Sequence, residues 1–157
     1  MDFDDIYTEG TQTKYLDEIL ALANEKHNAP VAVVKGLPGF GKTAVTKSWL
    51  KHYNLKHVYL NTTLLDEETL FDDSTKDEII SGESIVVFDD YAFAKDSIRK
   101  DVLNLIAYGN MKCGEGVYLT NVYPRMYIII ITLEPSRIEK FTDEEIKLFG
   151  LEKYKKK

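Results

Sequence analysis

The chain has 157 residues, a formal net charge of −6, and contents of 44% hydrophobic and 29% charged residues. Such a length and composition are typical of one folded domain, and they argue against intrinsic disorder, a fibrous repeat or a disulfide scaffold. The acidic balance argues against a broad nucleic-acid-binding surface but still allows a local basic groove.

The cysteine content and the length of the apolar runs indicate in which compartment the protein is expected. Cys113 is the only cysteine, so the sequence excludes an internal disulfide and a cysteine cluster for zinc. The acidic start at Met1 is unlike a secretory signal, and the longest apolar run, Tyr127–Ile131, is far shorter than the ~20 residues that cross a bilayer. We therefore expect a cytoplasmic protein with no membrane contact.

Periodicity predicts alternating helices and strands along the chain. Helices are expected over 12–27, 43–52, 67–81 (broken near 72–73) and 94–108, strands over 31–34, 56–60, 85–88 and 126–132, and a hairpin over 114–123. Thr142 and Glu145 form a capping-box pattern that opens a last short helix. This alternation indicates an α/β class with a mostly parallel sheet, which places ligands at the carboxyl ends of the strands.

A glycine-rich segment follows the first predicted strand. It matches the phosphate-loop pattern G-x-x-x-x-G-K-[ST] and precedes a predicted helix. The glycines permit sharp turns and leave the backbone amides and the helix N-terminus to cradle an anion. Lys42 suits the β- and γ-phosphates, and the Thr43 hydroxyl suits Mg²⁺. The pattern predicts ATP as substrate, Mg²⁺ as cofactor, and a nucleotide-binding set of Gly36, Leu37, Pro38, Gly39, Phe40, Gly41, Lys42, Thr43 and Ala44.

Polar residues also end two later predicted strands. Asp89 and Asp90 follow a buried run, with Asp89 lying 46 residues after Thr43. Charged groups at a buried strand end need a reason, and carboxylates there suit a metal site. We expect Asp89 to act on Mg²⁺ and Asp90 to polarise the attacking water as a general base. Thr132, which ends the last strand, is expected to hold that water or to touch the γ-phosphate; a solvated strand end is the alternative for all three.

The three segments Val31–Thr43, Ile85–Asp90 and Tyr127–Thr132 together resemble the core of AAA+ ATPases, in the order Walker A, Walker B and sensor 1. The likeness covers roughly residues 12–135, and a Leu-Asp-rich segment at 61–70 resembles MoxR-type ATPases within that group. The resemblance implies a three-layer P-loop NTPase fold. Residues 1–157 are then one domain, with an arm (1–11), a core (12–141), and a C-terminal helix with a Lys-rich tail (142–157).

The resemblance implies an ATP-driven subunit that works in a homo-oligomeric ring and remodels a partner protein. Three departures bear on this: Asp90 where the family usually has Glu, Thr132 where it usually has Asn, and about 25 residues after Thr132 with no evident lid domain. Arg137 is the only arginine after Thr132, so no arginine finger is evident and turnover by a monomer is expected to be slow.

Two alternatives stay open from the sequence. The first is a nucleotide-binding interaction module with little hydrolysis, motivated by the short C-terminal part and by Asp90. The second is a fragment of a nucleic-acid motor, because the Asp89–Asp90 end is also similar to superfamily-three viral helicases. Lys112 and Arg125 flank the predicted hairpin, and Tyr118 and Tyr123 lie on it; nucleic acid is nevertheless the less favoured partner.

Overall fold

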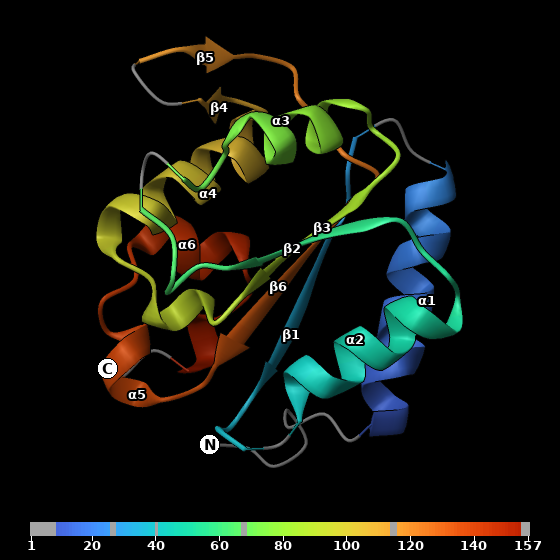
Figure 1. Ribbon diagram of the computed structural model, residues 1–157. Helices are drawn as coiled ribbons and strands as arrows, with labels where there is room; N and C mark the ends of the chain where they lie inside the picture. Colours follow the sequence, from blue (N-terminus) through green and yellow to red (C-terminus); the bar gives the residue numbers. More distant parts are fainter. Residues whose placement is uncertain (1–8, 26–27, 40, 67–68, 114–115, 155–157) are drawn as a thin grey trace.

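A parallel sheet lies between two layers of helices (Figure 1). The computed structural model describes residues 9–25, 28–39, 41–66, 69–113 and 116–154. Four strands form the sheet in the order β1-β6-β3-β2, and each pairs in parallel with its neighbours. They are β1 (Val31–Gly36), β6 (Met126–Thr132), β3 (Ile85–Asp89) and β2 (His57–Asn61). The α/β class and the parallel sheet expected from the sequence are therefore confirmed.

Two helices cover one face of the sheet. They are α1 (Glu9–Glu25) and α2 (Lys42–His52), and Leu16, Trp49 and Leu50 from them share an apolar cluster with β3 and β6. The opposite face carries α3 (Asp73–Ile80), α4 (Asp96–Tyr108), α5 (Pro135–Ile138) and α6 (Asp143–Leu148), with the short 3-10 turns η2 (Tyr91–Phe93) and η3 (Glu152–Tyr154).

Strand β6 shows that the sheet is covered by helices on both of its faces. All seven of its residues are buried; Ile128 and Ile130 face α1 and α2, while Ile129 and Ile131 face the other layer. Burial of an isoleucine side chain stabilises a fold by about 1.5–3 kcal/mol. A continuous apolar run is the pattern of a strand covered on both sides, so this prediction is confirmed.

Some predicted boundaries were wrong. Asp72 caps α3 by accepting from the Thr75 amide, so the helix begins at the expected break, not near residue 67; residues 67–68 lie outside the described part. Helix α4 begins at Asp96, because Ala94 and Lys95 have extended backbone. The hairpin pairs β4 (Met111–Lys112) with β5 (Tyr118–Leu119), so its first strand precedes the predicted range. The start of the hairpin depends on pairing with another segment, which local composition does not encode.

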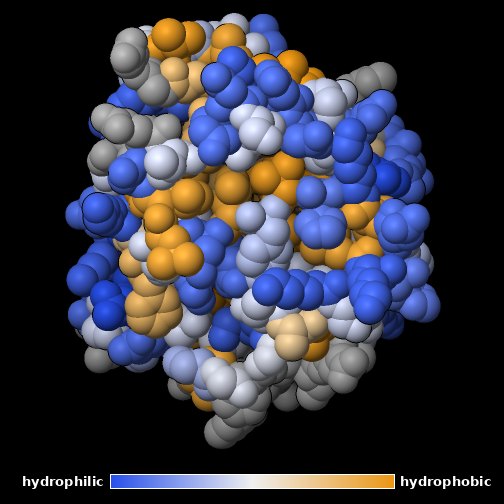
Figure 2. Space-filling view, in the orientation of Figure 1, coloured by the Kyte–Doolittle hydropathy of each residue, from blue (hydrophilic) through white to orange (hydrophobic). Residues whose placement is uncertain are grey.

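The C-terminal part of the chain belongs to the same core. The capping box at Thr142 and Glu145 is present, as predicted, and Ile146, Phe149 and Leu151 lie in the apolar cluster under β3 and β6. Of the helices described, none has both the length and the apolar character needed to cross a membrane. On the face seen in Figure 1, apolar residues are gathered across the middle and also lie at the top, with hydrophilic residues between them and along the right side (Figure 2).

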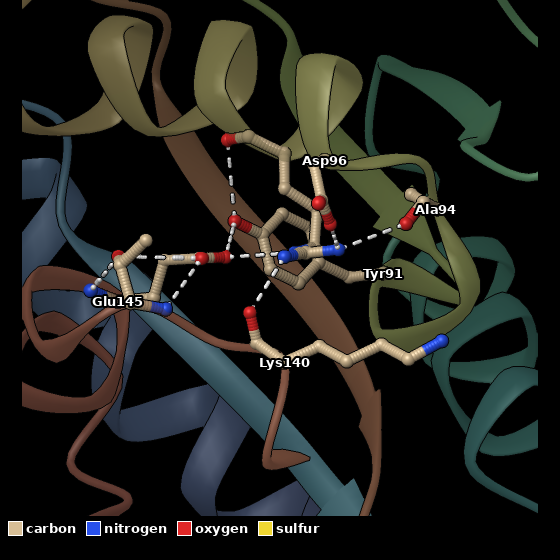
Figure 3. Close-up of polar contacts among 7 residues, drawn as sticks. Tyr91, Ala94, Asp96, Lys140 and Glu145 are labelled. Atoms are coloured by element: carbon tan, nitrogen blue, oxygen red, sulfur yellow. Dashed lines mark hydrogen bonds and ion pairs between the residues drawn. The ribbon is translucent and has the colours of Figure 1, made fainter. Parts of the chain in front are cut away.

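A buried polar network joins the segment after β3 to α6 (Figure 3). The Arg99 Nε donates to Glu145 Oε2 at 3.2 Å, and its two terminal nitrogens donate to the carbonyls of Ala94 and Lys140, each at 3.0 Å. The Tyr91 hydroxyl donates to the same Glu145 oxygen at 2.6 Å. Because the network holds Tyr91, it fixes the chain directly after the Asp89–Asp90 pair.

Candidate functional site

Most of the predicted site residues line one pocket at the carboxyl ends of β1, β3 and β6, whereas Gly36, Leu37 and Asp89 are not part of its lining. The pocket encloses about 660 Å³, which is within the range of ligand sites. It is lined by Pro38, Gly39, Gly41, Lys42, Thr43, Ala44, Lys47, Asp90, Phe93, Ile130 and Thr132. Parallel pairing of β1 with β6 and of β6 with β3 brings these segments, which are far apart in sequence, to one edge of the sheet.

The glycines of the loop after β1 do different jobs. Gly39 and Gly41 have φ of 83° and 76°, a left-handed backbone that L residues avoid, so they turn the chain into α2. Gly36 instead ends β1, and a Cβ there would lie 3.6 Å from Lys42 Cδ. The expectation that all three glycines make sharp turns is thus wrong for Gly36, which lies in strand β1. Phe40 lies outside the described residues.

Lys42 is the first residue of α2 and is 7% exposed. Its Nζ donates to the Leu37 carbonyl at 2.9 Å, so the ammonium lies across the loop. Burial lowers the pKa of Lys42, while the charges of Asp90 and Asp89 act in the opposite direction. The first amides of a helix have no partner within it, so a cation and free N–H groups lie together at this end of α2.

Asp89 and Thr43 are in direct contact. The Thr43 hydroxyl lies 3.0 Å from Asp89 Oδ1 and 3.1 Å from Oδ2, although the two residues are on different elements. Asp89 is 5% exposed and ends β3. The Thr62 amide and hydroxyl both donate to its carbonyl oxygen, at 3.1 and 2.9 Å. Backbone and side chain of Asp89 are therefore both held in place.

Asp90 turns away from β3 with φ of 56° and ψ of 35°. This left-handed backbone is tolerated best by glycine, Asn and Asp, and here it directs the chain into η2. Its carboxyl group lines the pocket. Burial, followed by the charge of Asp89, raises the pKa of Asp90, and Lys42 partly offsets the rise.

Thr132 is buried at the end of β6 and pairs in register with Gly36 of β1. The next amide, that of Leu133, donates to the Gly36 carbonyl at 2.8 Å, which fixes the end of β6 beside the start of the loop. Thr132 shares its face of β6 with Ile130, and both line the pocket. The structure thus brings Thr132 to the same pocket as Lys42 and Asp90.

Sequence reasoning missed three side chains near this pocket. Lys47 lies one helical turn after Thr43, a spacing that could have signalled it. Phe93 lines the opposite wall from η2, with the Arg137 guanidinium 4.7 Å from its ring centre. Tyr59 donates a short hydrogen bond to Asp89 Oδ2, and no local pattern around Tyr59 indicated it.

The oxygen groups here fit a magnesium ion better than a metal held by protein alone. Within the described ranges, no group of three or more His, Cys, Asp and Glu side chains could hold a metal. Mg²⁺, however, is usually held by one or two carboxylates together with substrate phosphates and water. The Thr43 hydroxyl and the Asp89 carboxylate, 3.0 Å apart, are oxygen ligands of the kind that Mg²⁺ uses.

The sheet, the loop after β1 and the helix that follows define a P-loop type of α/β fold. Among solved structures, the chain is similar to three mutant forms of RuvB from Thermotoga maritima. Their TM-scores are 0.58, 0.57 and 0.54, their identities 13%, 14% and 13%, and they cover 95%, 95% and 92% of this chain. The chain spans less than half of those RuvB chains, 46%, 46% and 44%.

These likenesses show the fold alone, a three-layer P-loop NTPase fold with a mostly parallel central sheet. The narrower likeness to MoxR-type ATPases gains no support from them. No protein-family model and no curated protein matches the sequence.

Proposed function

We propose that the chain binds ATP with Mg²⁺ and hydrolyses it. The observation that carries this proposal is a pocket on a P-loop fold that is lined by a buried lysine, a helix N-terminus and the Asp90 carboxylate, with the Asp89 carboxylate held against Thr43 of the same lining. The cation and the free amides suit a triphosphate, and the carboxylates suit its metal ion. A pocket for a neutral ligand would need neither the cation with the free amides nor the carboxylates.

Each side chain then has a stated task. Lys42 neutralises charge on the β- and γ-phosphates, and the loop residues Gly36 to Ala44, apart from Pro38, which has no N–H, bind the phosphates through their amides. Thr43 and Asp89 would hold Mg²⁺, which, when bound, neutralises phosphate charge. Asp90 accepts a proton from the attacking water, a role favoured by a raised pKa, and Thr132 orients that water.

The first test measures binding of ATP by calorimetry with Mg²⁺ present. Losing hydrogen bonds from a charged donor costs about 1.5–3 kcal/mol, so Lys42→Ala should weaken ATP binding about 10- to 100-fold. Lys51→Ala is the matched control, because Lys51 is exposed on the same helix and does not line the pocket. Equal affinity of Lys42→Ala and the unaltered chain would refute the phosphate site.

The second test separates hydrolysis from binding. Asp90→Asn keeps the side-chain shape and suits the left-handed backbone, but it cannot accept the proton. We expect phosphate release to fall about 100-fold or more while ATP affinity is retained. Equal release by both proteins would remove Asp90 from the mechanism. Tight binding without turnover, at any protein concentration, would favour the nucleotide-binding module instead.

We further propose that the chain acts as one P-loop domain in a homo-oligomer and remodels a partner protein, as the resemblance to AAA+ ATPases implies. Among the described residues, no arginine lines the pocket, although the Arg137 guanidinium lies 4.7 Å from the ring centre of Phe93, which does. Arginine fingers contribute about 10³–10⁵ in rate, and a neighbouring subunit can supply one. Sizing with and without Mg²⁺-ATP tests this: ring formation supports the proposal, and a monomer under all conditions refutes it.

A further inference from the structure

Tyr59 contacts the Asp89 carboxylate from the neighbouring strand. Its hydroxyl donates a short hydrogen bond to Asp89 Oδ2. Tyr59 does not line the phosphate pocket, and the mechanism proposed above does not use it. Its contact nevertheless falls on the carboxylate that would hold Mg²⁺ together with Thr43.

Strand register explains how the phenol reaches that position. Tyr59 pairs with Val87, so it stands diagonally from Asp89 on the same face of adjacent strands. Diagonal neighbours are about 7–8 Å apart, a gap that a tyrosine spans and a serine or threonine does not. Geometry of the sheet therefore places the hydroxyl on one particular carboxylate oxygen.

Both carboxylate oxygens of Asp89 accept hydrogen bonds. Tyr59 donates to Oδ2, the Asp90 amide donates to Oδ1 at 2.8 Å, and the Thr43 hydroxyl reaches both. A carboxylate has about four lone-pair sites, and these three donors use about three of them, so about one site remains for a metal ion. The carboxylate is thus oriented without being saturated.

Lys47 fixes the tyrosine from its other side. The Lys47 Nζ lies 4.7 Å from the centre of the Tyr59 ring, in a cation–π contact. Tyr59 is half-buried, and burial, together with the hydrogen bond to Asp89, raises its pKa. The phenol therefore stays protonated and remains a donor at neutral pH.

We propose that Tyr59 is a positioning residue for the metal: it holds the Asp89 carboxylate in the rotamer that faces Thr43, and so sets the Mg²⁺ concentration that nucleotide binding requires. The inference rests on the proposed function of the pocket. The last torsion of an aspartate is soft, so without the Tyr59 hydroxyl the carboxylate samples other orientations. Groups that orient metal ligands typically contribute 10- to 100-fold to metal affinity or activity.

The experiment titrates Mg²⁺ against a fixed amount of a non-hydrolysable ATP analogue and measures binding by calorimetry. Tyr59→Phe removes only the hydroxyl, and the matched control is Tyr127→Phe, because the Tyr127 hydroxyl is buried on β6 without a hydrogen-bond partner. We expect Tyr59→Phe to need about 10-fold more Mg²⁺ for half-maximal effect. Its affinity for the analogue in EDTA should match that of the unaltered chain, although loss of a hydrogen bond to a buried carboxylate should lower its melting temperature. Tyr127→Phe should match the unaltered chain in both the Mg²⁺ requirement and the affinity in EDTA.

A second background tests whether Tyr59 acts through Asp89. In Asp89→Asn the carboxylate is gone, so adding Tyr59→Phe should change the Mg²⁺ requirement less than twofold. Two results would overturn the role of Tyr59 but not the nucleotide site. The first is a Mg²⁺ requirement of Tyr59→Phe within twofold of that of the unaltered chain. The second is a shift in Mg²⁺ requirement that is equally large when Tyr59→Phe is added to Asp89→Asn. Absence of analogue binding by the unaltered chain, with Mg²⁺ or without it, would overturn the nucleotide site itself.

Discussion

The Arg99–Glu145 pair gives the sharpest prediction about stability. The side chains of Arg99 and Glu145 are 4% and 3% exposed, and they lie in the network that links η2, α4 and α6 (Figure 3). We consider Arg99→Met, which keeps a long unbranched side chain but removes the guanidinium.

The magnitude follows from what the substitution leaves behind. Glu145 keeps the Tyr91 hydroxyl at 2.6 Å and the Thr142 amide at 3.0 Å, but its charge loses its buried cation. The carbonyls of Ala94 and Lys140 lose the donors that reach them at 3.0 Å. Removing one partner of a buried pair costs about 3–5 kcal/mol, so Arg99→Met should lower the free energy of unfolding by about that amount.

Glu145→Gln is the companion variant. It keeps the shape and the capping-box acceptor, and Asp96, 2.8 Å from Arg99 Nη1, still compensates the arginine charge. We expect a loss of about 1–3 kcal/mol. The double variant should lose less than the two single losses combined, by about 0.5–3 kcal/mol, because both act on one network.

Urea unfolding followed by tryptophan fluorescence measures all four proteins. Trp49 is the single tryptophan and is buried between α1 and α2, so its emission reports loss of the core. Two results would refute the reasoning, since either would mean that Arg99 and Glu145 are not coupled in the folded state. One is a decrease in the free energy of unfolding of less than about 1 kcal/mol for Arg99→Met. The other is a double variant whose decrease equals the sum of the decreases of the two single variants.

Three further outcomes follow from single positions. Because the pKa of Asp90 is raised in the folded state, the ionised carboxylate destabilises that state. Asp90→Asn should therefore increase the free energy of unfolding at pH 7, and this increase should vanish below about pH 4. Unfolding curves of the two proteins that coincide at both pH values would contradict this. Gly109→Ala should cost about 1–2 kcal/mol or more in thermal unfolding, because φ is 67° and the new Cβ would lie 3.1 Å from the Tyr123 ring. Asp17→Ala should shift the emission of Trp49, whose indole N–H donates to Asp17 at 2.9 Å; an unchanged spectrum in the folded protein would argue against that bond.

Much of the fold was predictable because it is encoded locally. The buried run of β6 and the continuous apolar residues of β3 predicted central strands, and Thr142 with Glu145 predicted the start of α6. The phosphate-loop pattern likewise predicted a loop between a strand and a helix, which the structure has between β1 and α2, while the anion site itself stays a prediction. Element ends were less predictable, as the starts of α3 and of the hairpin show, since they depend on a single cap or on pairing with another segment.

The sequence alone determined which residue types could do phosphate and metal chemistry, and that they follow strands, because periodicity and the Gly36–Thr43 pattern are properties of neighbouring residues. Only the tertiary structure decided which of them meet. Tyr59 reaches Asp89 through the register of β2 on β3, and Arg99 finds Glu145 46 residues away through the packing of α4 on α6. Such contacts depend on how buried surfaces fit together, and that fit is a property of the whole chain.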